Sequence, residues 1–363
     1  MHTRLFLFGL LLLAGLSSVP FAAQGQNQVQ EPTAGKPVVY ILATGGTIAG
    51  TGSSSTVAAY KPGELGVDQL LAALPELNDI ADVRGEQIVN ISSQNMNTHI
   101  WLQLAKRINS LLAQEEVAGV VITHGTDTQE ETAYFLNLTV KSTKPVVLTG
   151  AMRPSTALSA DGPRNLYNAV ACALAPAAQN QGVMLVMDDR ILSADDVTKT
   201  HTLNVNAFQS PNYGPIGYIY GGQPYFMRST QKRHTQGSEF DISLLQELPR
   251  VDILLGYAGA DGSLVDALVK TGTQGIVYAG MGNGNPPDAA LTALAQARSQ
   301  GIAIVRAARL PSGPSTQWNE IDDDAYGFAA SWFLNPQKAR ILLMLALTQT
   351  QDYKEIQRMF LEY

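Results

Sequence analysis

Short apolar runs recur along the 363-residue chain and alternate with amphipathic segments. The runs are rich in Val and Ile and apolar on both faces, which is typical of strands buried in a largely parallel sheet. They lie at residues 38–43, 117–123, 145–150, 182–187, 252–258, 275–280 and 301–305. Helical spacing predicts helices at 100–114, 162–177 and 288–300. Strands that alternate with helices predict an α/β fold.

A polar and charged stretch at 228–249 interrupts this alternation, which restarts at Val251. We therefore predict two α/β domains with mainly parallel sheets, a larger N-terminal one at 37–227 and a smaller C-terminal one at 250–363. The connector at 228–249 contains a short helical pattern, SLLQEL, so we expect it to pack against the protein.

The first 23 residues have the layout of a secretory signal peptide: Arg4, an apolar stretch at 5–16, then small residues that include Pro20. The apolar stretch is shorter than the roughly 18–20 residues that cross a bilayer. The alternative is a buried N-terminal helix. Residues 24–36 are polar without periodicity, and we expect them to be disordered. The signal peptide predicts export to the periplasm.

Composition narrows the function classes. The formal net charge of −7 with no basic cluster argues against nucleic-acid binding. A hydrophobic content of 45% allows a large core, and we expect no membrane segment beyond residues 1–23. The single cysteine, Cys172, excludes an internal disulfide. Cys172 could be a nucleophile, but its place in the apolar run AVACALA favours a small buried helix residue.

Polar residues follow several of the predicted strands, and open parallel sheets bind ligands at that edge. TGGT (44–47) follows the first strand, HGTDT (124–128) the second, and DVTKT (196–200) comes later. Gly45 and Gly46 allow a sharp turn with outward N–H groups, which could hold an anion or oxyanion beside Thr47. An ordinary turn is the alternative, and the lysine of a phosphate-binding P-loop is missing.

Several of these residues have a second interpretation. Asp127 could cap a following helix, since QEETAYFLNL has helical spacing. Lys199 could be a surface ion-pair partner, or it could lie buried beside Thr126 and accept a proton. His124 suits a packed histidine better than a base. The five histidines show no metal-ligand spacing, so we expect no metal and no other cofactor.

A small-residue segment, GTGSSSTVAAYK (50–61), directly follows Thr47 and contains Tyr60 near its end. Such a segment could be a lid that closes over a substrate. A surface loop without function is the alternative.

Six segments together resemble the bacterial type II asparaginase and glutaminase-asparaginase family. They are ATGGTIAG (43–50), VITHGTDTQEETAYFL (121–136), GAMRPSTALSADGPRNLYNAV (150–170), DVTKT (196–200), YAGMGNGN (278–285) and NPQKARILLMLALTQT (335–350). The resemblance runs from about residue 37 to residue 363, and the pair TGGTIAG and HGTDT is highly specific. The segments KRHTQGSEFDI and TQDYKEIQRMFLEY look closer to the glutaminase-asparaginase branch.

The resemblance implies the catalytic residues. Thr47 would be the nucleophile, and Tyr60 on the lid would activate or position it. Thr126, Asp127 and Lys199 would form a second, proton-handling group. The implied reaction is hydrolysis of L-asparagine to L-aspartate and ammonia through an acyl-enzyme, and of L-glutamine to L-glutamate. Backbone N–H groups near residue 151 and the Thr126 hydroxyl are candidates for stabilising the oxyanion.

The resemblance also implies how the substrate and the subunits are arranged. Ser93 and Gln94 would bind the α-carboxylate and α-amino group, and Thr126 and Asp127 would also contact the substrate. The family assembles as a homotetramer, a dimer of dimers, with active sites shared between subunits. Glu320 would therefore reach the α-amino group from the neighbouring subunit.

Two departures from the family pattern concern specificity and stability. Where several relatives have asparagine after Tyr-Ala, this chain has Gly259, so one support of the Glu320 region is absent. Some relatives have a disulfide that this chain cannot form.

Two other functions fit parts of the pattern. A periplasmic amino-acid-binding protein would also be exported and built of two α/β domains, but it would need no nucleophile. A cytoplasmic relative acting in metabolism or on charged tRNA is disfavoured by the signal segment and the acidic charge.

Overall fold

The computed structural model describes residues 35–56 and 60–363, and of Tyr60 it describes only the backbone. The predicted signal peptide and residues 24–34 of the predicted disordered segment therefore lie outside the described residues. Within the described ranges, no helix is both long and apolar enough to span a bilayer.

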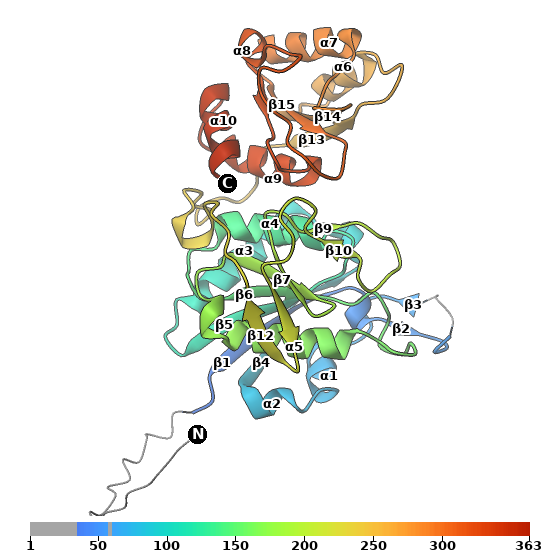
Figure 1. Ribbon diagram of the computed structural model, residues 1–363, viewed down its shortest axis with the longest axis vertical. Coiled ribbons are helices and arrows are strands. Elements are labelled where there is room, and N and C mark those ends of the chain that lie inside the picture. Colours follow the sequence, from blue (N-terminus) through green and yellow to red (C-terminus); the bar gives the residue numbers. More distant parts are fainter. Residues whose placement is uncertain (1–34, 57–59) are drawn as a thin grey trace, which may run out of the picture. The chain divides into compact units, whose positions relative to one another are not determined.

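The larger sheet has eight strands (Figure 1). They are β1 (Val38–Gly45), β4 (Asp82–Ile91), β5 (Val117–Thr123), β6 (Val146–Thr149), β7 (Val183–Met187), β8 (Arg190–Ser193), β11 (Gly217–Tyr220) and β12 (Gln223–Phe226). Their order is β12-β11-β8-β7-β6-β5-β1-β4. The five strands from β4 to β7 in this order run parallel, and β8, β11 and β12 extend one edge in antiparallel fashion.

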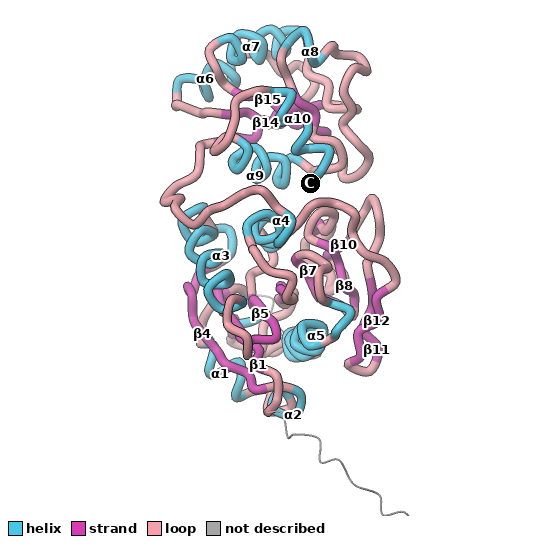
Figure 2. The backbone as a smooth tube through the Cα atoms, turned by 90° about the vertical axis from the view of Figure 1, so that its left-hand side faces the viewer, coloured by secondary structure: helices cyan, strands magenta, loops and turns pink. Residues whose placement is uncertain are grey.

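Both faces of the larger sheet are covered, which explains the unbroken apolar runs in the sequence. Leu42 of β1 packs in one hydrophobic cluster with α3 (Thr98–Leu112) and α4 (Gln129–Thr139). Its neighbour Ile41 points to the other face and packs in a second cluster with α5 (Gly162–Leu174). α3 and α5 thus cover opposite sides of the sheet (Figure 2).

One crossover of the larger sheet is left-handed. α3, α4 and α5 all belong to connections that advance in the same direction along the sheet, from β4 to β5, β6 and then β7. Right-handed crossovers that advance in one direction place their helices on one face. α3 and α4 share a face, whereas α5 lies on the other, so the β6–α5–β7 crossover is the left-handed one. The start of α5 thereby packs beneath the turn that follows β1, where a Cβ on Gly162 would lie 3.1 Å from Ile48.

The smaller sheet has four parallel strands in sequence order, β13 (Val251–Leu255), β14 (Gly275–Gly280), β15 (Ala303–Ala308) and β16 (Ala329–Ala330). Helices α6 (Ser263–Lys270) and α7 (Asp288–Ser299) cover one face. α9 (Pro336–Ala346) covers the other face and also packs against α4, so one hydrophobic cluster extends from the larger sheet to the smaller. The predicted fold class, two α/β parts with mainly parallel sheets, is confirmed.

The helix expected in the connector is absent, and its residues form turns. Proline explains the difference, because Pro249 has no N–H to pair with the Leu245 carbonyl in a helix. That carbonyl accepts from Lys106 at 2.6 Å, and Asp241 accepts from the Ser243 N–H at 2.8 Å. Leu245 and Leu248 pack against the core, so the expectation that the connector packs is confirmed.

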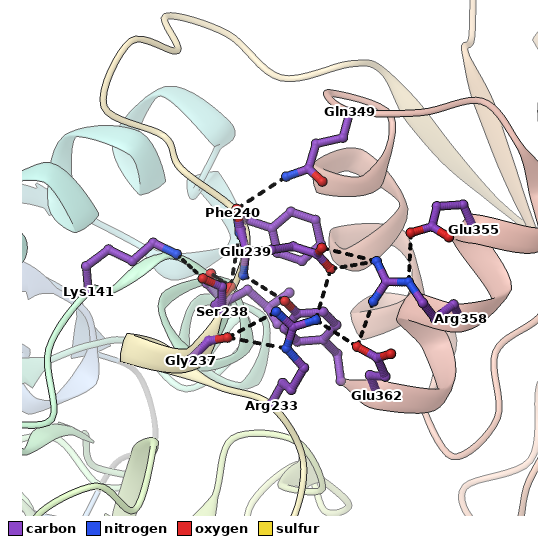
Figure 3. A network of polar contacts seen from close by, with 12 residues as sticks. Lys141, Arg233, Gly237, Ser238, Glu239, Phe240, Gln349, Glu355, Arg358 and Glu362 are labelled. Carbon is purple, nitrogen blue, oxygen red and sulfur yellow. Dashed lines mark hydrogen bonds and ion pairs between the residues drawn. The ribbon is translucent and has the colours of Figure 1, made fainter.

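A ring of four charged side chains ties the connector to α10 (Tyr353–Glu362) (Figure 3). Arg233 lies 2.7 Å from Glu362 and 3.4 Å from Glu239. Arg358 closes the ring, at 2.6 Å from Glu362 and 3.0 Å from Glu239. The hydroxyl of the last residue, Tyr363, accepts from the Glu239 N–H at 2.8 Å. The last helix therefore holds the connector in place.

Candidate active site

The two glycine-containing motifs leave neighbouring strands at a reversal of the strand order. β1 and β5 pair directly, with Ala43 opposite Thr123. The chain continues from β1 to β4 on one side and from β5 to β6 on the other. Loops that diverge in this way open a crevice beyond the carboxyl ends of the strands, where open α/β sheets bind ligands. TGGT and HGTDT are these two loops.

The turn after β1 places Thr47 against the loop after β5. Gly45 and Gly46 have φ of 100° and 84°, values that favour glycine. A Cβ on Gly46 would lie 2.3 Å from the Gly125 Cα, so the two backbones touch. Thr47 then begins a short 3-10 helix, η1 (Thr47–Ala49), and is 6% exposed.

Lys199 joins the loop after β5 through its amine. The Lys199 Nζ lies 2.9 Å from the Thr126 Oγ1 and 2.7 Å from an Asp127 carboxylate oxygen. Thr126 is buried, whereas the Asp127 side chain is 57% exposed and Lys199 is 17% exposed. Lys199 therefore forms an ion pair with Asp127 and also contacts the buried Thr126 hydroxyl.

Two helices hold Lys199 in this position, and the sequence analysis did not single out either contact. The Lys199 N–H donates to the Glu130 carboxylate at 3.0 Å, and Glu130 is buried in the first turn of α4. The buried amine of Lys338, on α9, donates to the Val197 carbonyl two residues before Lys199. Burial lowers the pKa of Lys338. Glu130 and Lys338 both belong to segments that carried the family resemblance, which was the available signal.

Asp127 does not cap α4, contrary to the alternative drawn from the sequence. The helix is preceded by Thr128, whose side chain makes no capping hydrogen bond. The Asp127 carboxylate is paired with Lys199 instead. The acidic residues in the first turn of α4 are Glu130 and Glu131. Carboxylates in this position interact favourably with the positive end of the helix dipole.

Ser93 adds a third loop, which follows β4. It lies in the 3-10 turn η2 (Ser93–Asn95), and its Oγ accepts from the Asp127 N–H at 3.1 Å. The Ser93 carbonyl accepts from Thr128 at 2.8 Å. Ser93 is buried, and the adjacent Gln94 is exposed. The loops that carry Thr47, Ser93 and Thr126 are thus in direct contact.

The two residues for which the sequence favoured packing are indeed packed. His124 is fully buried, and its ring nitrogens lie 2.6 Å from the Gly125 carbonyl and 2.9 Å from the Thr132 hydroxyl. Burial lowers the pKa of His124 to about 4, so the ring is neutral at pH 7. Cys172 is buried within α5, and burial raises the pKa of its thiol to about 12. A thiol in that state is a poor nucleophile.

The segment proposed as a lid is described only at its base. β2 (Thr51–Gly52) pairs with β3 (Tyr60–Lys61) in antiparallel fashion, while residues 57–59 and the Tyr60 side chain lie outside the described residues. The Thr156 hydroxyl accepts from the Gly52 N–H at 2.8 Å, and the Ser55 carbonyl accepts from Leu158 at 3.1 Å. The base of the segment is therefore attached to the loop that precedes α5.

That loop also shapes the backbone near Ala151, where we expected oxyanion donors. The Asp161 carboxylate accepts from the N–H groups of Met152 and Arg153 at 3.0 and 2.9 Å. The Asn165 amide donates to the Gly150 carbonyl at 3.0 Å. These contacts fix the turn around the buried Ala151. Asp161 and Asn165 were not singled out in the sequence analysis, although they belong to a segment that carried the family resemblance.

Glu320 lies apart from this group in the chain fold. It sits in the loop between β15 and α8 (Asp323–Tyr326), next to the smaller sheet, and it is exposed. The contacts that join the loops of Thr47, Ser93, Thr126 and Lys199 do not include Glu320.

Two family models match this chain. "Asparaginase, N-terminal" matches residues 38–232, and "Glutaminase/Asparaginase C-terminal domain" matches residues 250–360. The L-asparaginase 2 of Escherichia coli (strain K12) is 55% identical over 327 residues, which cover 90% of this chain and 93% of that protein.

Other relatives carry related names. A probable periplasmic L-asparaginase of Haemophilus influenzae is 52% identical and covers 90% of this chain and 93% of its own length. A glutaminase-asparaginase of Pseudomonas fluorescens biotype A is 48% identical and covers 97% of both chains.

A solved structure agrees with these matches. The crystal structure of a probable cytoplasmic L-asparaginase from Campylobacter jejuni has a TM-score of 0.88 and 51% identity, and the match covers 90% of this chain and 100% of that one. The two family models together span both sheets of this fold. The chain therefore belongs to the glutaminase/asparaginase family.

Proposed function

We propose that this protein is an L-asparaginase that hydrolyses L-asparagine to L-aspartate and ammonia and also hydrolyses L-glutamine. Membership of the family and the names of the relatives support this activity. The alternative of an amino-acid-binding protein without turnover is not supported by the comparisons.

The observation that carries the mechanism is the contact between Lys199 and Thr126. Because the Lys199 amine lies 2.9 Å from the Thr126 Oγ1, this oxygen can accept a hydrogen bond from the amine. The hydroxyl hydrogen of Thr126 is then available to a substrate atom in the crevice. Asp127, at 2.7 Å from the same amine, balances its charge. A lysine, a carboxylate and a hydroxyl that are connected in this way can transfer a proton. A threonine nucleophile needs such groups, because its hydroxyl is a poor nucleophile without a positioned base.

In the proposed reaction, Thr47 attacks the side-chain amide carbon and forms the Oγ–carbon bond. The hydroxyl proton passes to a neighbouring base, and the tetrahedral oxyanion is stabilised by nearby N–H and hydroxyl donors. The carbon–nitrogen bond then breaks, and the nitrogen leaves as ammonia after taking up a proton. Water then adds to the acyl carbon, the Oγ–carbon bond breaks, and the Thr47 Oγ takes up a proton as the carboxylate product is released. We assign Tyr60 to activating or positioning Thr47, and Thr126, Asp127 and Lys199 to handling the protons.

We assign substrate binding mainly to residues on the loops that contact the Thr47 turn. Ser93 and Gln94 would hold the α-carboxylate and α-amino group, with Thr126 and Asp127 completing the pocket. Glu320 would meet the α-ammonium from a second subunit. Carboxylates at the ammonium explain selection of a zwitterionic amino acid over a simple amide, because opposite charges in a partly desolvated crevice attract.

Assembly, location and domain limits belong to the same proposal. We propose a homotetramer built from two dimers with shared active sites. We propose export to the periplasm, which the name of the H. influenzae relative supports and that of the C. jejuni structure does not. We place the domains at 37–227 and 250–363, joined by the connector at 228–249, because the family matches end at 232 and resume at 250.

The test is ammonia release by the purified protein with L-asparagine and with L-glutamine as substrates. We expect turnover of both, with a kcat/KM ratio below about 100, because one methylene discriminates between substrates by about 10–200-fold. The Thr47→Ala variant is the control for contaminating activity. A wild-type protein that released no ammonia from either amide would overturn the proposal.

A further inference from the structure

A buried ion pair fixes the end of the loop that carries Glu320, where the chain enters α8. The Arg306 guanidinium on β15 binds both carboxylate oxygens of Asp323, the first residue of α8, at 2.6 and 2.7 Å. The two side chains are 1% and 0% exposed. Two parallel hydrogen bonds between a guanidinium and a carboxylate fix orientation as well as distance. α8 is therefore held rigidly against the smaller sheet.

The same guanidinium also anchors the loop at Thr316, four residues before Glu320. Arg306 donates to the Thr316 carbonyl and to the Asn283 carbonyl, both at 3.0 Å. Asn283 and Thr316 are joined by two further hydrogen bonds, of 2.6 and 2.8 Å. One side chain thus holds three separate segments of the chain together.

Trp318 shows how tightly the intervening backbone is constrained. Its N–H donates to Asp323 at 3.2 Å, and its indole N–H donates to Asp324 at 3.1 Å. Trp318 has a φ of 54°, which is unfavourable for a residue with a bulky side chain. Such a conformation persists where surrounding contacts determine it, and it is found preferentially at functional sites. Glu320 lies between Trp318 and Asp323, exposed and held from both sides.

We propose that Arg306 and Asp323 are positioning residues for Glu320, which they hold so that its carboxylate can receive the α-ammonium group of the substrate. The inference rests on the proposed function. Replacing a whole buried ion pair by apolar residues is often neutral for stability, so the presence of this pair is weak evidence for a stabilising role. The network fixes the residues on both sides of an exposed carboxylate, and that carboxylate is the one the proposed reaction requires.

The experiment uses the full-length chain, with Arg306→Lys as the main variant. Lysine keeps the charge but cannot bind a carboxylate with two parallel donors. Steady-state kinetics would be measured on L-asparagine and on succinamic acid, which is asparagine without the α-amino group. We expect KM for L-asparagine to rise about tenfold, the effect of losing one charge-assisted hydrogen bond, with a smaller change in kcat. The preference for L-asparagine over succinamic acid should fall by the same factor.

A double-mutant cycle tests whether Arg306 acts through Glu320. Glu320→Ala should reduce the same preference, and adding Arg306→Lys to it should reduce the preference no further, because the two residues form one unit. Ile304→Val is the matched control: Ile304 is buried on the same strand but packs in the cluster of α6 and α7. It should lower the melting temperature and leave the preference unchanged.

Three outcomes would overturn the proposal. The preference could stay unchanged in Arg306→Lys while its melting temperature falls, it could fall further in the double variant, or it could be insensitive to Glu320→Ala. If Arg306→Lys does not fold, Asn283→Ala removes the two side-chain hydrogen bonds to Thr316 and leaves the ion pair intact, with the same expectations.

Binding separates this proposal from the proposed reaction. Calorimetry in the Thr47→Ala background compares L-aspartate with succinate and requires no turnover. We expect Arg306→Lys to weaken L-aspartate binding about tenfold and to leave succinate binding unchanged. Equal L-aspartate affinity with and without Arg306→Lys would overturn the positioning role, whereas failure of the reaction itself would show in the wild-type ammonia assay.

Discussion

Gly46 and Gly125 touch through their backbones, with only 2.3 Å between the Gly125 Cα and the place where a Cβ on Gly46 would stand. Neither position tolerates a side chain, since a Cβ on Gly125 would lie 2.6 Å from the Ser93 Oγ. The contact sets the separation between the turn that presents Thr47 and the loop that carries Thr126. The glycines of TGGT and HGTDT therefore serve close approach as well as sharp turning.

Gly46→Ala should nearly abolish activity. The methyl group would overlap the Gly125 backbone, and the φ of 84° adds strain, together about 2–4 kcal/mol of lost stability. A displacement of the catalytic turn by about 1 Å costs about a hundredfold in rate. Thermal unfolding and kcat measured together check this.

Gly259→Ala separates strain from overlap. Gly259 has a φ of 82° but no atoms within 4 Å of an added Cβ. The Gly259→Ala variant should be about 1 kcal/mol less stable than the wild-type protein and should keep the wild-type kcat. If Gly46→Ala behaved like Gly259→Ala, the close approach of the two backbones would have no catalytic importance.

Thr47→Ala should reduce kcat by about 10⁴-fold or more and leave L-aspartate binding and the melting temperature largely unchanged. The change removes one hydroxyl group and one methyl group from a buried turn without altering its backbone. Single-turnover assays with L-asparagine and calorimetry with L-aspartate provide the two measurements. A variant that kept more than a few per cent of the wild-type rate would exclude Thr47 as the nucleophile.

Lys199→Met should lower kcat by about 10²–10⁴-fold with a smaller change in KM. Methionine preserves much of the side-chain length but removes the amine that contacts Thr126 and Asp127. The backbone bond from residue 199 to Glu130 is retained, so the segment should stay in place. A rise in KM alone would assign Lys199 to ground-state binding.

Much of the fold could be predicted because its parallel strands are buried on both faces. The runs that became β1, β5, β6, β7, β13, β14 and β15 are short, apolar and β-branched, and few other structures fit that pattern. β4 escaped the sequence analysis because it is an edge strand with no fully buried residue, so its sequence contains no unbroken apolar run. The short helical pattern of the connector forms turns because Pro249 cannot pair with the Leu245 carbonyl, which accepts from Lys106 instead.

Some residues of the candidate site could likewise be indicated by the sequence, whereas others could not. The strand pattern placed motif residues such as Thr47 and Asp127 at one edge of the sheet, and the family resemblance implied their roles. Contacts between elements distant in sequence could not be predicted, because nothing local marks them. Lys338 bonding to Val197 and Arg306 bonding to Asp323 are examples: each is a buried charge whose partner becomes known only from the fold.

Glu131 makes the stability of the fold depend on pH. Burial raises its pKa to about 7 from an ordinary value of 4.5, and Arg340, at 4.0 Å, offsets only part of the effect. The folded state therefore binds this proton more tightly than the unfolded state. The contribution of Glu131 to stability is greatest below pH 4.5 and is lost as the pH rises through 7.

Glu131→Gln should raise the free energy of unfolding by about 2 kcal/mol at pH 8 and change it little at pH 4.5. Glutamine resembles the protonated carboxyl group and has no charge to desolvate. Glu116→Gln, at an exposed glutamate, is the control and should have little effect at either pH. Equal effects of Glu131→Gln at both pH values would contradict the assignment.

Complementation between two inactive variants tests whether the active site is shared. Thr47 follows β1 of the larger sheet, whereas Glu320 follows β15 of the smaller sheet. If two chains meet about a two-fold axis, each site takes Thr47 from one chain and Glu320 from the other. A mixed dimer of Thr47→Ala and Glu320→Ala chains then contains one doubly altered site and one wild-type site.

With random pairing, half of the dimers are mixed, so about a quarter of all sites should regain wild-type activity. The two variants would be unfolded and refolded together, and kcat compared with that of each refolded alone. Size-exclusion chromatography of Glu320→Ala checks that the substitution does not disturb assembly, since an exposed residue is expected to leave folding intact. If both variants assemble normally and the mixture gains nothing beyond the sum of its parts, Glu320 does not act across the subunit boundary. The role of Arg306 would then have to be sought within a single chain.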